Sequence, residues 1–222
     1  MFFAFIFSHV QEFDVAWDCA TGNGQAAFEL AKKFRRVEAT DVSQNQLANA
    51  KTAPNIFYSV RAAEKPKFEK SFDLVTVAKA IHWFNIEAFY EEAKRVSKSN
   101  GTIAMWGYSL LSIDTRIDPI ILDFYTNVIG SYWDKERKLV DEQYRTISFP
   151  FEEIETPSFK FSFEWTLAEL EGYLTTWSSV QKYVKANQVN PVSNLIRLIQ
   201  PKWIGDRMKI SFPLFVRIGR IK

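Results

Sequence analysis

Hydrophobic residues follow two patterns in this 222-residue chain. In its first half, short apolar runs predict buried strands over residues 14–18, 37–41, 56–60, 73–78 and 102–106. Apolar residues at helical spacing predict helices between them, over 25–36, 43–51 and 86–97. Strands that alternate with helices in this way are typical of a parallel α/β sheet covered on both faces.

The second half of the chain has a different period. Apolar and polar residues alternate in 159–165 and 208–218, which predicts antiparallel strands near a sheet edge, and Pro213 suits an edge. Helical segments are predicted over 167–186 and 192–200. Residues 110–150 show no strand period and predict a mostly helical insertion on the substrate side. We therefore expect one domain over 1–222 with that insertion.

Local signals add boundaries to these elements. Ser43 and Asn85 are predicted N-caps of the helices that follow them, and Asn100-Gly101 is expected to close the helix over 86–97. The aromatic start, Met1-Phe-Phe-Ala-Phe-Ile-Phe7, has no basic segment before it and no small-residue cleavage site after it. We interpret it as the end of a helix that packs ahead of the first strand, not as a signal peptide.

Composition narrows the class of protein. At 47% hydrophobic and 24% charged, with a formal net charge of +2, the chain is ordinary globular material with no strong electrostatic preference for nucleic acid. One cysteine and two histidines argue against a disulfide and against a metal site. No apolar run reaches the length of a membrane span. We predict a cytoplasmic protein without a metal, nucleic-acid or membrane partner, and expect a monomer or homodimer.

The segment Asp14–Ala27 carries the clearest chemistry. A predicted strand ends at Asp18, Gly22 and Gly24 follow it, and a helix begins directly after them. Glycines let the backbone turn tightly and approach a ligand closely. Asp18 would attract an ammonium group, and Asp41, after the second strand, could bind ribose hydroxyls. A ligand with an amino group, a carboxylate and a ribose, such as S-adenosylmethionine, satisfies these features together.

A dinucleotide is the competing ligand. Gly22-x-Gly24-x-x-Ala27 also matches the dinucleotide fingerprint, and Asp41 lies about where that fingerprint places its acid. Asp18 and the antiparallel C-terminal strand favour S-adenosylmethionine, because the dinucleotide fold is mostly parallel.

Two further positions follow predicted strands. Glu64, next to Ala63, could contact an adenine amine, cap a loop, or lie on the solvated surface. His82, next to Trp83, follows the fourth strand at the edge where open α/β sheets bind ligands. His82 is our candidate catalytic residue, although a lone histidine is more often a packed structural residue.

With these residues in place, the chain resembles the class I S-adenosylmethionine-dependent methyltransferases, and within them the methyltransferase type 11 group related to trans-aconitate methyltransferase. The resemblance covers nearly the whole chain. The stretches that carry it are Trp17–Ala27, Ala39–Ser43 with Gln46-Leu47, Ala63-Glu64, Phe72–Val75, Ala80–Phe84, Tyr132-Trp133, Phe149–Phe151 and Tyr173–Ser178.

The resemblance implies a Rossmann-like, seven-stranded, mostly parallel sheet with an antiparallel C-terminal strand. It also implies a cofactor site formed by Asp18, Ala20, Gly22, Gly24, Gln25, Asp41, Val42, Gln46, Ala63, Glu64, Ala78, His82 and Trp83. Two departures from the family stand out. Ala20 replaces a usual glycine, and the chain begins too late to supply a complete N-terminal helix over the cofactor.

Methyl transfer from a sulfonium needs positioning more than a dedicated nucleophile. Aromatic rings near the sulfonium could stabilise its charge, and an arginine could hold a carboxylic acid acceptor. The substrate candidates are Tyr132, Trp133, Arg116, Arg137 and Arg145. We predict a methyltransferase for a small molecule, with a carboxylic acid among the candidate acceptors. The alternatives are an NAD(P)-dependent oxidoreductase and a truncated cofactor-binding protein without activity.

Overall fold

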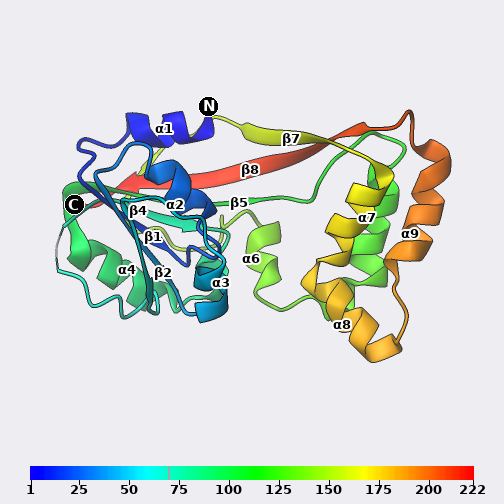
Figure 1. Ribbon diagram of the computed structural model, residues 1–222, viewed down its shortest axis with the longest axis horizontal. Coiled ribbons are helices and arrows are strands. Elements are labelled where there is room, and N and C mark those ends of the chain that lie inside the picture. Colours follow the sequence, from blue (N-terminus) through cyan, green and yellow to red (C-terminus); the bar gives the residue numbers. More distant parts are fainter. Residues whose placement is uncertain (70) are drawn as a thin grey trace. The chain divides into compact units, whose positions relative to one another are not determined.

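The predicted parallel strands lie side by side in one sheet. A computed structural model describes residues 1–69 and 71–222, and its eight-stranded sheet follows the path β3-β2-β1-β4-β5-β8-β6, with β7 paired to β8 (Figure 1). The parallel strands are β1 (Val15–Cys19), β2 (Arg36–Asp41), β3 (Ile56–Val60), β4 (Phe72–Ala78) and β5 (Ser97–Tyr108). The antiparallel strands are β6 (Glu152–Ile154), β7 (Phe159–Trp165) and β8 (Met208–Arg220). The predicted mostly parallel α/β fold with antiparallel C-terminal pairing is confirmed, with eight strands in place of the expected seven.

The chain divides into two compact units. The first unit contains Met1–Tyr108, Glu142–Ser158 and Phe215–Lys222, and the second contains Ser109–Asp141 and Phe159–Leu214. Residues 110–150 are therefore shared between the units, and the helical part extends well beyond them. The expected single domain with an insertion stays a prediction.

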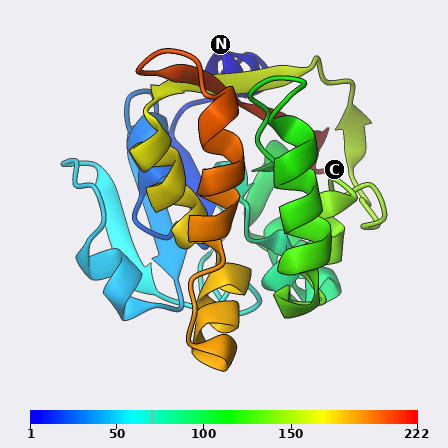
Figure 2. The ribbon, with the colours of Figure 1, turned by 90° about the vertical axis from the view of Figure 1, so that its right-hand side faces the viewer.

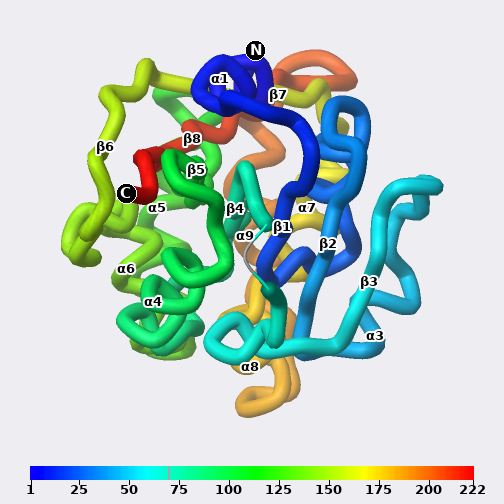
Figure 3. The backbone as a smooth tube through the Cα atoms, turned by 90° about the vertical axis from the view of Figure 1, so that its left-hand side faces the viewer, coloured from blue at the N-terminus to red at the C-terminus, as the bar shows by residue number. Residues whose placement is uncertain are grey.

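The first unit carries the parallel strands in a register that aligns their C-terminal ends. Asp18 pairs with Ala39, Asp41 with Val60, and Cys19 with Val77, so these ends meet at one edge of the sheet. Figure 3 shows β3, β2, β1 and β4 next to one another. Every residue of β1 is buried, as expected for a strand covered on both faces.

In the first unit, two predicted N-caps are confirmed, and two predicted helices are shorter than expected. The Ser43 side chain accepts a hydrogen bond at the start of α3 (Gln44–Ala48), and Asn85 does so for α4 (Ile86–Val96). The helix α2 (Gln25–Leu30) ends earlier than predicted, in a turn, and α3 is shorter than the predicted 43–51. The helix α1 (Phe2–Ser8) places Phe2 and Phe3 against Trp106, with ring centroids 5.3 and 5.9 Å apart.

Asn100-Gly101 does not close α4, contrary to prediction. The backbone is already extended at Ser97, and β5 starts there. Phe72 pairs with Ser97 but Leu74 pairs with Thr102, so Asn100 and Gly101 belong to an irregularity inside β5. Asn100 has a φ of +64°, which is a conformation that asparagine tolerates better than most residues.

The second unit combines helices with β7 and the first half of β8. Its helices are α5 (Asp118–Asp123), α6 (Arg137–Asp141), α7 (Leu167–Thr175), α8 (Ser178–Asn187) and α9 (Val192–Ile199). Figure 2 shows α9 (orange) beside α7 (yellow) and α5 (green), and α9 contacts both. Phe212 is buried at the centre of an aromatic cluster with Phe161, Trp165 and Tyr173.

The alternating strands are confirmed, but Pro213 does not lie on an edge strand. The strand β8 has neighbours on both sides in the sheet order. Pro213 pairs with Lys160 of β7, and its carbonyl accepts a hydrogen bond from the Ser109 N–H at 2.9 Å. Proline is tolerated there because β5 has already ended at Tyr108, so the missing N–H removes no regular ladder bond. Within residues 1–69 and 71–222, no helix has both the length and the apolar character to cross a bilayer.

Candidate functional site

A cavity of about 540 Å³ in the first unit lies where the C-terminal ends of β1 to β4 meet. Nine of the predicted cofactor-site residues line it, namely Ala20, Gly22, Asp41, Val42, Gln46, Ala63, Glu64, Ala78 and Trp83. Asp18, Gly24, Gln25 and His82 are not among its lining residues. Ligands of open α/β sheets bind at this edge, so this cavity is the candidate site.

The two glycines of the turn serve different purposes. Gly22 has a φ of +57°, and a Cβ built there would meet nothing within 4 Å, so Gly22 borders open space. Gly24 has a φ of +76°, and its Cβ would lie 2.1 Å from the Tyr58 hydroxyl oxygen. Gly24 is required by packing, whereas Gly22 keeps room at the cavity. Ala20 has a φ of +53°, a conformation that favours glycine, which explains why a glycine is usual here.

Asp41 ties the second strand to the glycine turn. Its Oδ2 atom accepts a hydrogen bond from the Gly22 N–H at 2.9 Å, and its Oδ1 atom accepts one from the Ser43 N–H at 2.8 Å. A carboxylate offers about four acceptor positions. Asp41 can therefore hold the turn and still accept further hydrogen bonds from a ligand.

Asp18 lies behind the turn and not at the cavity surface. It is fully buried, and the hydroxyls of Thr21 and Thr76 donate hydrogen bonds to its two carboxylate oxygens. Burial raises the pKa of Asp18 from 3.8 to about 6, although these hydroxyl bonds oppose the rise. The expectation that Asp18 meets a ligand's ammonium group directly is not supported by this placement. Asp18 instead stabilises the residue next to Gly22.

Glu64 closes one wall of the cavity. Its Oε1 atom accepts a hydrogen bond from the backbone N–H of Asn85 at 2.9 Å. Asn85 in turn caps α4 with its own side chain. Of the three roles considered from the sequence, capping a loop is therefore one that Glu64 performs, and its position at the cavity keeps ligand contact open.

His82 and Trp83 lie in the short 3-10 helix η1 (Ile81–Trp83), directly after β4. Trp83 lines the cavity and is 59% exposed. His82 is buried, and its Nδ1 atom lies 3.0 Å from the hydroxyl oxygen of Tyr144. His82 thus supports the wall, whereas its neighbours Ala80, Trp83 and Phe84 form it.

Two cationic residues that line the cavity were not predicted from the sequence. Arg61 follows the last residue of β3, and Lys79 follows the last residue of β4. The Arg61 guanidinium donates to the Pro66 carbonyl and lies 4.6 Å from the Phe68 ring centroid. The Lys79 ammonium lies 3.6 Å from the Tyr108 ring centroid. Arg61 and Lys79 could have been predicted from their position directly after a parallel strand. Three further residues also line the cavity, namely Ser43, Ala80 and Phe84.

Three predicted substrate residues, Tyr132, Trp133 and Arg137, belong to the second unit, and Arg145 belongs to the first. The Arg137 guanidinium carbon lies 4.6 Å from the Trp133 ring centroid, and its Nε donates to the Tyr125 hydroxyl at 2.8 Å. Tyr132 accepts a hydrogen bond from Asn187. Arg145 is exposed beside Gln143. The structure thus groups Trp133 with Arg137 and leaves Arg145 elsewhere.

Arg116, the remaining arginine candidate, is on the surface of the second unit. Its guanidinium is paired with Asp114, two residues away. Nε and one terminal nitrogen of Arg116 both donate to the Asp114 carboxylate, so its two-pronged donor edge is already occupied.

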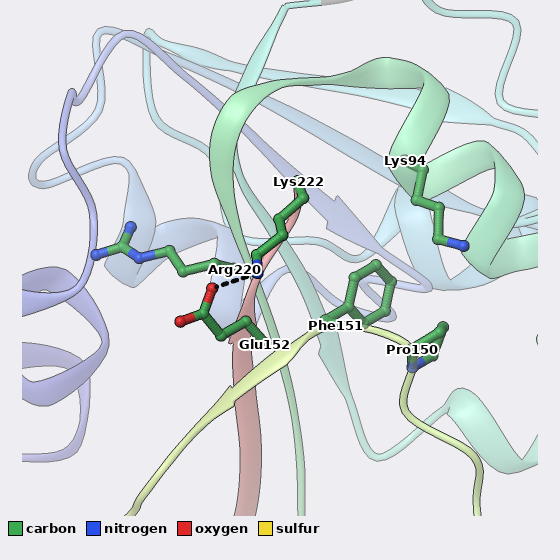
Figure 4. A pocket seen from close by; sticks show the side chains of 6 residues that line it. All are labelled: Lys94, Pro150, Phe151, Glu152, Arg220 and Lys222. Carbon is green, nitrogen blue, oxygen red and sulfur yellow. Dashed lines mark ion pairs between the residues drawn. The ribbon is translucent and has the colours of Figure 1, made fainter.

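A second cavity of about 520 Å³ lies at the opposite end of the strands, where Ile221 bonds to Gly101 at the start of β5. Three cations, Lys94, Arg220 and Lys222, border it together with Pro150, Phe151 and Glu152. Figure 4 shows Lys94 and Arg220 pointing away from each other, while Lys222 pairs with Glu152 at 3.2 Å. The cations do not converge on one point, so this cavity is not a candidate site.

Comparisons with known proteins show that this chain is similar to methyltransferases. The family profile described as a methyltransferase domain matches residues 17–105. A Dictyostelium discoideum protein named as a methyltransferase is 36% identical over 228 residues, which cover 98% of this chain and 87% of that protein. A Saccharomyces cerevisiae protein named as an S-adenosylmethionine-dependent methyltransferase is 30% identical over 131 residues, covering 54% of this chain and 42% of that protein.

A solved structure extends the comparison to the whole fold. It is described as a type II methyltransferase from Anaeromyxobacter dehalogenans and is 30% identical to this chain. The superposition has a TM-score of 0.92 and covers 99% of this chain and 95% of the other.

Proposed function

Because the chain belongs to the class I S-adenosylmethionine-dependent methyltransferases, we propose that it methylates a small molecule that carries a carboxylate. S-adenosylmethionine is the cofactor of this family. Because the chain belongs to this family, we set aside the dinucleotide-dependent oxidoreductase function that the glycine spacing also allowed. The closer relation to trans-aconitate methyltransferase stays a prediction.

The cavity at the ends of β1 to β4 fits this cofactor. Gly22 leaves open space at the wall, where a larger side chain would enter the cavity. Asp41 keeps acceptor positions for the ribose hydroxyls, as an acid after the second strand does in nucleotide-binding sheets. Ala63 and Glu64 border the same cavity after β3, where they are suited to the adenine. These residues are our proposed cofactor contacts, with Trp83 as an aromatic wall.

Bound S-adenosylmethionine supplies a methyl group that its sulfonium charge already activates. The chain's own residues therefore need to orient the two partners and exclude water, and this positioning can supply much of the rate acceleration. No nucleophile has to be assigned. We keep His82 as a proposed functional residue, because it is a buried residue of η1 whose neighbours Ala80, Trp83 and Phe84 line the cavity.

The surroundings of Arg137 are the observation that supports a carboxylate as the methyl acceptor. Its Nε is bound to the Tyr125 hydroxyl and to Asp141, and its side chain is only 18% exposed. Among residues 1–69 and 71–222, its two terminal nitrogens have no hydrogen-bond partner. The stack on Trp133 fixes the plane of the guanidinium. An oriented guanidinium with free terminal N–H groups matches the two oxygens of a carboxylate.

A transfer assay tests this proposal. The protein is incubated with S-adenosylmethionine labelled in its methyl group, and with small di- and tricarboxylic acids or their neutral amides. We expect label in the acids and none in the amides. Label in the amides alone would contradict the acceptor class. Binding of S-adenosylhomocysteine without turnover on any small molecule would instead support the inactive, cofactor-binding alternative.

We also propose that the protein acts in the cytoplasm, as a monomer or homodimer. Its single cysteine, Cys19, is buried and unpaired, which suits a reducing compartment.

A further inference from the structure

A hydrogen bond joins the wall of the cavity to a residue far along the chain. The hydroxyl oxygen of Tyr144 lies 3.0 Å from Nδ1 of His82, and the two residues are separated by 62 positions. Their rings are stacked, with centroids 6.0 Å apart and planes inclined by 29°. Both side chains are buried in the first unit. The bond therefore joins η1 to a buried residue of the same unit.

The backbone at Tyr144 has an unusual conformation. Gln143 and Tyr144 have φ values of +56° and +59°, so two successive non-glycine residues are left-handed. Such residues persist only where their surroundings hold them firmly, and they cluster at functional sites. Here the conformation directs the Tyr144 side chain into the protein, where it is fully buried.

Two residues of β8 hold Tyr144 in place. Arg217 donates a hydrogen bond from Nη1 to the Tyr144 carbonyl at 3.0 Å, and it also binds the Ile147 carbonyl. Glu153 fixes Arg217 through an ion pair of 2.7 Å. The ring of Phe215 packs edge-on against the Tyr144 ring at 5.0 Å.

The strand β5 makes room for this arrangement. A Cβ at Gly107 would lie 2.4 Å from the Phe215 ring, so only glycine lets Phe215 reach its position against Tyr144. The tyrosine is thus fixed by β5 and β8 together. Its hydroxyl connects it to η1 through the His82 imidazole.

We propose that Tyr144 is a positioning residue of the cofactor site, acting through the His82 imidazole to fix the wall formed by Ala80, Trp83 and Phe84. This rests on the proposed cofactor cavity. A phenol can either donate or accept a hydrogen bond, so it can hold His82 in either neutral tautomer and as the imidazolium. Removing the hydroxyl leaves Nδ1 buried without this partner and releases the restraint on η1.

Tyr144→Phe tests the proposal, because it removes one oxygen and keeps the ring packing. We expect its dissociation constant for S-adenosylhomocysteine, measured by titration calorimetry, to rise about tenfold, in line with the loss of one buried hydrogen bond. The matched control is Tyr90→Phe, another buried tyrosine of the first unit, whose hydroxyl contacts the Met105 sulfur instead. Its affinity should stay at the wild-type value.

A double-mutant cycle with His82→Ala separates positioning from general destabilisation. If Tyr144 acts through the imidazole, adding Tyr144→Phe to His82→Ala should weaken binding by less than about twofold. His82→Asn keeps a polar atom near the Nδ1 position and should retain most of the affinity that His82→Ala loses. The comparison of His82→Asn with His82→Ala needs no Tyr144 variant, so it also serves if Tyr144→Phe alone fails to fold.

Three results separate the inference from the proposed function. No binding of S-adenosylhomocysteine to the wild-type protein would contradict the proposed cofactor cavity. Wild-type binding with an unchanged Tyr144→Phe affinity would overturn the inference alone. Full additivity in the cycle, or no recovery in His82→Asn, would overturn it as well.

Discussion

The Oδ2 atom of Asp41 accepts a hydrogen bond from the Gly22 backbone N–H at 2.9 Å. This bond joins the acid after the second strand to the glycine turn after the first. The other Asp41 oxygen accepts from the Ser43 N–H, which also orients the start of α3. Asp41 and the glycine turn therefore hold each other in place, and a change in either should affect the other.

Asp41→Asn should weaken cofactor binding strongly. The asparagine amide would direct an N–H group toward one of the two backbone donors, and a hydrogen bond to a charged group contributes about 1.5–3 kcal/mol. We therefore expect a rise of about tenfold to a hundredfold in the dissociation constant of S-adenosylhomocysteine. Titration calorimetry measures it. Glu38→Gln is the matched control, because Glu38 lies on the same strand but pairs with Arg36. Equal losses in both variants would contradict the assignment.

Gly22→Ala and Gly24→Ala should separate binding from folding. A methyl group at Gly22 enters open space at the cavity, whereas one at Gly24 collides with the Tyr58 hydroxyl. Both pay a left-handed backbone cost of about 1–2 kcal/mol. Gly24→Ala should therefore lower the melting temperature more, and Gly22→Ala should lower the affinity for S-adenosylhomocysteine more. Thermal denaturation and calorimetry on both variants check this order, and the reverse order would refute it.

The sequence predicts those cavity residues that lie at the ends of predicted strands. Asp41 and Ala78 follow from two apolar runs, because the carboxyl ends of parallel strands share one edge of a sheet. Ser43 and Asn85 follow from local capping chemistry. These predictions depend on few residues, all near one another in the chain.

Contacts between distant segments could not be predicted in this way. Asp18 turns inward because Thr76 of β4, paired with it in the sheet, donates to its carboxylate. That pairing depends on the sheet order, which places β4 next to β1. The contact of His82 with Tyr144 likewise depends on β8 lying beside β5. The prediction for Asn100-Gly101 is wrong because the same dipeptide suits both a helix end and a strand irregularity.

The burial of Asp18 should make stability depend on pH. Its pKa is raised from 3.8 to about 6 in the folded protein, so the folded state binds more protons than the unfolded state between these values. The free energy of unfolding should thus receive a contribution that is complete below about pH 4 and lost by about pH 6. Its size is about 3 kcal/mol, at 1.36 kcal/mol per pKa unit.

Asp18→Asn checks this contribution, because the amide keeps two polar atoms near Thr21 and Thr76 but does not titrate. Urea unfolding from pH 4 to pH 7 should show the wild-type protein losing stability relative to the variant as the pH rises. Parallel curves for the two proteins would mean that Asp18 does not titrate in this range.

Arg137→Lys should raise the KM for an acidic acceptor. Lysine keeps the charge but loses the planar, two-pronged donor that stacks on Trp133. We expect a rise of about tenfold with little change in cofactor affinity, as for the loss of one charge-assisted hydrogen bond. Steady-state kinetics on a methylated acid measures it, with Arg116→Lys as control because Arg116 is paired with Asp114. A KM raised equally in the control would remove Arg137 from the acceptor site.

Titration of the wild-type protein with S-adenosylhomocysteine and, separately, with NADH distinguishes a methyltransferase cofactor site from a dinucleotide site. We expect saturable binding of S-adenosylhomocysteine at one site per chain, weakened by Asp41→Asn, and no binding of NADH. Binding of NADH without affinity for S-adenosylhomocysteine would contradict this expectation.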